Sequence, residues 1–150
     1  MRYILVFLTL ISSFVTASTI RVENSTITKE MVPVSYFNVE GATYKFTNTI
    51  APHSRGVIEF NMSNVKKDAS RFPVVFKYLI AYEMIPMTID ILTIEIYACN
   101  SPGCADSVYW KATLRDGSKV KIAQADGNKG REMSLHALSK SNVLTIKDIY

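Results

Sequence analysis

The stretch FPVVFKYLIAY, from Phe72 to Tyr82, decides the fold. Its apolar side chains recur at every second position, namely Phe72, Val74, Phe76, Tyr78, Ile80 and Tyr82. Successive side chains of a β-strand point to opposite faces, so this alternation predicts a strand with one face in the core. The opposite face is only partly polar, with Val75, Lys77, Leu79 and Ala81, and Ile89 and Ile91 repeat this in the next run. Apolar residues on both faces predict either a covering loop or an exposed apolar patch.

Runs of the same kind occur on both sides of this stretch, and no amphipathic helical window is present. The predicted strands are Thr19–Thr26, Val34–Glu40, Thr43–Thr49, Gly56–Met62, Phe72–Tyr82, Thr88–Ala98, Val108–Arg115, Ser118–Gln124, Glu132–Ala137 and Asn142–Ile149. The sequence therefore predicts an all-β protein, a single-domain antiparallel β-sandwich of about eight to ten strands. The alternative is a small closed calycin-like β-barrel, which would differ by enclosing an apolar cavity.

The first seventeen residues have the features of a signal peptide. Arg2 precedes a short apolar segment, Tyr3–Ile11, and Val15-Thr16-Ala17 provides a small-x-small cleavage site. The apolar segment is too short to span a membrane, which takes about 20 residues. We therefore expect residues 1–17 to be cleaved and residues 18–150 to form a single β domain without a transmembrane segment. The protein is expected to be secreted or periplasmic.

Both cysteines lie in one short loop, Cys99-Asn-Ser-Pro-Gly-Cys104. An exported chain passes through an oxidising compartment, so we expect a disulfide between Cys99 and Cys104. The spacing does not fit a thioredoxin-type redox site or a zinc site. Such a bridge would fix the turn and would present Asn100, Ser101 and Pro102 as a rigid recognition loop.

A hairpin is predicted from Tyr109 to Ala123, with the turn at Arg115-Asp116-Gly117. Its register would pair Trp110 with Ile122 on the inner face, so Trp110 is expected in the core. The outward face would carry Tyr109, Lys111, Arg115, Lys119 and Lys121, with Lys111 directly opposite Lys121. Like charges in that position are unfavourable, so the cluster is either solvated or neutralised by an anionic partner.

The charge distribution also indicates an anionic partner. Residues 107–150 carry eight basic and four acidic side chains, whereas residues 18–106 carry eight basic and nine acidic ones. Because an exported protein rarely meets nucleic acid, the expected partners are an acidic protein, an anionic glycan or a lipid headgroup, and not nucleic acid. A solvated basic surface that aids solubility is the alternative interpretation.

No local motif specifies a reaction, a cofactor or a metal. The two histidines, His53 and His136, stand outside any catalytic pattern, and the loop Asp126–Gly130 lacks the later ligands of a calcium loop. We therefore expect no cofactor, no metal and no enzymatic activity. The triplets beginning at Asn24 and Asn61 match the glycosylation pattern and leave that modification open.

These features predict a secreted or periplasmic, non-enzymatic binding module. Adhesion, a fimbria-associated role or a host-contact role in virulence would suit it, with Thr19–Thr26 as a possible exchangeable edge strand. A barrel that binds a small apolar ligand, or that acts as a sensor or partner protein, is the second hypothesis. A glycan hydrolase with two facing carboxylates is the third.

Overall fold

The computed structural model describes residues 18–66, 71–82, 85–98, 108–115, 118–124, 132–136 and 142–149. These residues form two five-stranded sheets. In chain order the strands are β1 (Ser18–Asn24), β2 (Lys29–Phe37), β3 (Thr43–Phe46), β4 (Ser54–Asn61), β5 (Val74–Tyr82), β6 (Ile85–Ala98), β7 (Val108–Leu114), β8 (Val120–Ile122), β9 (Glu132–His136) and β10 (Val143–Asp148). Each predicted run thus overlaps one of these strands, and the largest difference in position is the start of β2.

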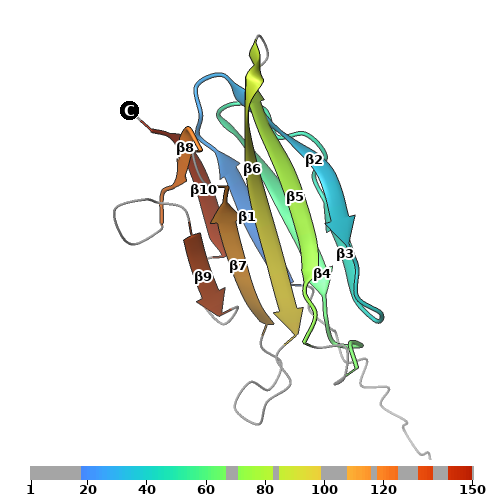
Figure 1. Cartoon of the computed structure of the whole chain (residues 1–150). Helices are drawn as coiled ribbons and strands as arrows, with labels where there is room; N and C mark the ends of the chain where they lie inside the picture. Colours follow the sequence, from blue (N-terminus) through green and yellow to red (C-terminus); the bar gives the residue numbers. More distant parts are fainter. Residues whose placement is uncertain are drawn as a thin grey trace, which may run out of the picture.

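The two sheets pack face to face as a β-sandwich (Figure 1). Sheet A has the order β3-β4-β1-β10-β8, and sheet B has the order β2-β5-β6-β7-β9. The predicted all-β sandwich is confirmed. The barrel alternative is wrong, because β3, β8, β2 and β9 each have one hydrogen-bonded neighbour and a closed barrel needs two for every strand. The largest side chains that fill the space between the sheets are Trp110, Tyr78, Phe60 and Phe76.

β5 lies near the middle of sheet B, as its sequence predicted. Val74, Phe76, Tyr78 and Ile80 are buried in the core, whereas Phe72 precedes the strand and is half exposed. β5 pairs antiparallel with β2 on one side and with β6 on the other. The strong alternation of β5 therefore marks a strand whose inner face packs against the opposite sheet.

The predicted hairpin between β7 and β8 is wrong. β7 pairs with β6 and β9 in sheet B, whereas β8 pairs with β10 in sheet A. Trp110 is opposite Ile96 and Leu135, not Ile122, and Lys111 is opposite Glu95 and Ser134, not Lys121. The alternation could not reveal this, because Val120 and Ile122 point into the core in either arrangement.

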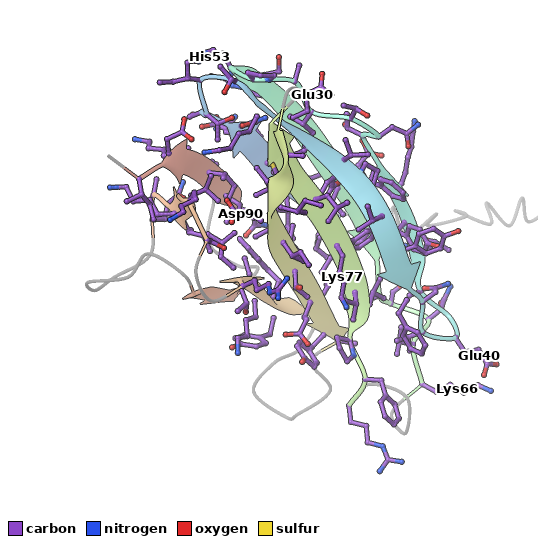
Figure 2. The ribbon with its side chains drawn as sticks, turned by 45° about the horizontal axis from the view of Figure 1, so that its top comes forward. Glu30, Glu40, His53, Lys66, Lys77 and Asp90 are labelled. Atoms are coloured by element: carbon purple, nitrogen blue, oxygen red, sulfur yellow. The ribbon has the colours of Figure 1, made fainter. Side chains whose placement is uncertain are left out.

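The chain therefore crosses from sheet B to sheet A between β7 and β8. Asp90 of β6, whose position is shown in Figure 2, fixes the crossing. Both of its carboxylate oxygens accept the Lys119 N–H, at 3.1 and 3.0 Å. The Ser118 hydroxyl donates to the Arg115 carbonyl at 2.6 Å, which links the end of β7 to the residues that lead into β8.

β1 is an inner strand, which overturns its proposed role as an exchangeable edge. It pairs antiparallel with β4 and parallel with β10, so sheet A is mixed where an antiparallel sandwich was predicted. Both edges of β1 are thus hydrogen-bonded within the same sheet.

A buried polar network connects the end of β1 with the start of β2 at Lys29. The Asn24 amide donates to the carbonyls of Lys29 and Ile50, at 2.7 and 2.9 Å. The buried Lys29 ammonium forms an ion pair with Asp148 of β10, so a charged residue is accommodated in the core. A glycan on Asn24 is incompatible with this fold, because its amide nitrogen is buried and already donates twice.

Candidate functional site

The outer face of sheet A collects most of the basic side chains of the described strands. Strand alternation places most apolar residues of β1, β4, β8 and β10 in the core and most of their charged residues outside, although Val57 and Val143 also face outward. Six basic side chains and two carboxylates share this outer surface, which we call the basic face: Arg21, Lys45, Arg55, Lys119, Lys121 and Lys147, with Glu23 and Glu59. Its excess of positive charge equals the formal charge of +4 of the whole chain.

Glu23 of β1 is the acidic centre of this face. One of its carboxylate oxygens lies 3.3 Å from Nε of Arg21 and 3.3 Å from Nε of Arg55. The other accepts the Thr145 hydroxyl at 3.2 Å, and Gln124 donates to that same hydroxyl oxygen at 2.8 Å. Two guanidinium groups therefore share one carboxylate, and with Glu59 of β4 the charges of β1 and β4 on this face balance.

Lysines dominate the other end of the face, at β8 and β10. Lys121 is directly opposite Lys147 in the antiparallel ladder. Lys119 lies two residues before Lys121 and therefore on the same face. All three side chains are exposed, and no acidic side chain in the described part of the chain forms an ion pair with them. Directly opposed like charges are unfavourable across a ladder, so an anion bound between them would relieve repulsion.

The predicted site residues lie on both sides of the sandwich. Lys119 and Lys121 belong to the basic face, whereas Tyr109 and Lys111 point outward from sheet B and Arg115 follows β7. The predicted cluster of all five on one surface is therefore wrong. Its physical cause is the crossing after β7, which separates Lys111 from Lys121 by the thickness of the molecule.

Sequence reasoning missed Lys147, Arg21 and Arg55. Lys147 follows Val143 and Thr145 on the outward positions of the last strand, so its direction could have been read from alternation. Its place beside Lys121 could not, because the pairing of β8 with β10 depends on tertiary structure.

A smaller aromatic group lies on the outer face of sheet B, near the end of the β6–β7 hairpin. The rings of Tyr97 and Tyr109 are 5.8 Å apart, and the Tyr97 hydroxyl donates to Glu95 at 3.4 Å. Burial raises the pKa of Tyr97, and the charge of Glu95 and this hydrogen bond raise it further, against the opposing effect of Lys111. This surface is polar and aromatic, and Glu95 is directly opposite Lys111 on it.

Several predictions fall outside the described residues. These are the signal peptide, the disulfide between Cys99 and Cys104, and the recognition loop Asn100, Ser101 and Pro102. The flanking geometry is described: β6 and β7 form a hairpin in which Ala98 is opposite Val108, so Cys99 directly follows a paired residue. The disulfide stays a prediction.

Among the described residues, no group of three or more His, Cys, Asp or Glu side chains could hold a metal ion. The same part of the chain contains no helix long and apolar enough to cross a membrane. No family model matches the sequence, and neither the curated proteins nor the solved structures provide a match.

Proposed function

We propose that the protein is an exported, non-enzymatic binding module whose basic face binds an anionic glycan. The observation that carries the proposal is the lysine group of β8 and β10, in which Lys121 and Lys147 oppose each other. Adhesion or host contact through such glycans is the biological role that we propose with it.

The composition of the basic face favours a polyanion over a protein partner. Protein interfaces are rich in aromatic side chains at their centre, whereas the outward positions of sheet A carry none among the described residues. Neighbouring strands lie about 4.8 Å apart and same-face residues about 6.8 Å apart along a strand, so the cations form a grid over which repeated sulfate or carboxylate groups can bind. A linear acidic glycan can cross several strands at once.

Cleavage at the predicted site is compatible with the fold. Ser18, the residue after that site, is opposite Phe60 of β4, so the described part of β1 lies wholly within residues 18–150.

Charge reversal on the lysine group tests the proposal. We expect Lys121→Glu combined with Lys147→Glu to weaken binding to heparin, used as a sulfated probe, by at least about tenfold, because both cations are lost and repulsion replaces them. Binding by the unmodified protein should weaken between about 50 and 500 mM NaCl, since exposed charges are screened by salt. Calorimetry or surface plasmon resonance gives both values.

A matched control makes the same change in net charge elsewhere. Lys66→Glu combined with Arg71→Glu alters two exposed basic side chains that lie outside the basic face, and heparin affinity should change by less than about threefold. Equal loss in both double variants would show that only net charge matters. Absence of heparin binding by the unmodified protein at low salt would also overturn the proposal.

A further inference from the structure

The outer face of sheet B carries an exposed apolar strip. Val32 of β2 is directly opposite Leu79 of β5, which is opposite Ile91 of β6, so three apolar side chains form one row across three strands. Ala81 and Ile89 extend the strip by one alternation, and no described segment crosses this face (Figure 1). Val32 is 37% exposed and Ile89 is 44% exposed. Of the two alternatives that the sequence left open, a covering loop or an exposed apolar patch, the described residues favour the exposed patch.

The charges around the apolar strip balance. Glu30 and Lys77, both shown in Figure 2, lie on this face together with Glu95 and Lys111. Within β2, β5, β6 and β7, these two acidic and two basic side chains leave no net charge, whereas the basic face of sheet A would repel a second copy of itself. Of the two broad faces, the outer face of sheet B is the one that can meet its own copy without electrostatic repulsion.

The size of this face suits a dimer of modest affinity. β2, β5, β6 and β7 lie about 4.8 Å apart and β5 is about 30 Å long, so they span roughly 19 Å by 30 Å, or about 570 Å², before side-chain relief is added. A standard interface buries about 800 Å² on each partner. The flat area of about 570 Å² is below that value, so the expected dimer has a small interface and modest affinity.

Edge-to-edge pairing through β2 is hindered, which favours contact through the face. The backbone N–H and C=O of Met31 are already bonded to Ile50, at 3.0 and 2.9 Å. Pro33 lacks an N–H, and a bulge between Pro33 and Ser35 interrupts the strand.

From the apolar strip, the balanced charges and the area, we infer that the protein forms a two-fold symmetric dimer in which the outer faces of sheet B pack against each other. A two-fold axis in the interface brings the same surface of both copies together, so each apolar strip is covered by its partner. The dimer leaves the basic face of each copy exposed.

Sedimentation equilibrium from about 1 to 200 µM tests this inference on the exported protein, with a dissociation constant expected in the micromolar range. Val32→Lys combined with Ile89→Lys adds four charges to the dimer interface and should raise the dissociation constant at least about tenfold. Val57→Lys is the matched control, because Val57 is also 37% exposed but lies on sheet A. It should change the constant by less than about twofold.

Two results would overturn the dimer. One is an unmodified protein that stays monomeric at about 200 µM, and the other is a dimer that Val32→Lys and Ile89→Lys weaken no more than Val57→Lys does. If the double variant does not fold, as judged by its thermal transition, Ile89→Lys alone serves the same comparison. Heparin binding by the monomeric variant should persist, which separates failure of the dimer from failure of the proposed glycan binding.

Discussion

Tyr78 is a core residue with an unusual polar group. Its ring fills the space between the sheets, yet among the described residues its hydroxyl is the buried side-chain polar atom that has no hydrogen-bond partner. Burial raises the pKa of Tyr78 to about 12. Burial of the Tyr78 ring stabilises the folded protein. Burial of its hydroxyl without a hydrogen-bond partner is unfavourable and offsets part of that stabilisation.

We predict that Tyr78→Phe stabilises the protein by about 1 kcal/mol at pH 7, because it removes the unpaired hydroxyl and keeps the ring. The raised pKa means that the folded protein retains the proton while the unfolded chain releases it near pH 10, so the free energy of unfolding falls as pH rises from 10 to about 12. Urea unfolding at pH 7 and pH 11 measures both effects. Tyr78→Phe should lose less stability at pH 11 than the parent, and an equal loss would contradict this account.

Trp110 is the largest side chain that is fully buried, as the alternation of β7 predicted, while its neighbour Tyr109 points outward. Its indole Nε1 donates to Asn142 at 3.3 Å. Trp110→Ala should lower the free energy of unfolding by about 3 to 5 kcal/mol, since it leaves a large cavity and an unpaired amide oxygen. Chemical denaturation measures this loss of free energy of unfolding, with Tyr109→Ala as the comparison. A loss below about 1 kcal/mol would show that the core tolerates the cavity.

At the scale of elements, the crossing from β7 to β8 decides the topology. The segment could have closed a hairpin, but β9 occupies the free edge of β7 and β8 pairs with β10 instead. Asp90 supports that choice, because its buried carboxylate accepts the Lys119 N–H where β8 begins. The Ile149 N–H donates to the Lys119 carbonyl at 3.1 Å, so Lys119 is held on both sides of its backbone.

Asp90→Ala should therefore destabilise the protein by about 2 kcal/mol, the range for loss of a hydrogen bond to a charged group. In Asp90→Ala, hydrogen exchange should show that the Lys119 amide loses more protection than the amides of β4. The reason is that the protein then opens locally at the crossing between β7 and β8. Asp90→Asn keeps an acceptor and should recover part of the loss. A uniform change in exchange across both sheets would argue against a local role for Asp90.

At the scale of the whole molecule, the two broad faces of the sandwich differ in charge and composition. The outer surface of sheet A is the basic face. The outer surface of sheet B carries the apolar strip, and the charged side chains around that strip balance. In the proposed dimer the sheet B faces meet, so the two basic faces point away from each other. One dimer can then join two separate polyanionic surfaces.

This arrangement predicts bridging. The unmodified protein should aggregate heparin-coated beads at concentrations above its dimer dissociation constant, whereas Val32→Lys combined with Ile89→Lys should coat the beads without joining them, since each monomer has one basic face. Light scattering follows aggregation, and the amount of bound protein is the control. Equal aggregation by the two proteins would contradict the predicted geometry.

The sequence by itself determined the strands and the direction of their side chains. Alternation is a local property of the chain, so it located ten strands, placed Trp110 and the inner face of β5 in the core, and showed that the outer face of β5 is partly apolar, which left a covering loop and an exposed patch as alternatives. Only the tertiary structure decided which strands are neighbours. Val120 and Ile122 face a core in a hairpin with β7 or in a pair with β10, and the choice depends on distant partners such as Asp90 and β9. That choice removed Lys121 from Lys111 and placed it opposite Lys147, because side-chain direction is encoded within a strand whereas strand pairing depends on contacts far apart in the chain.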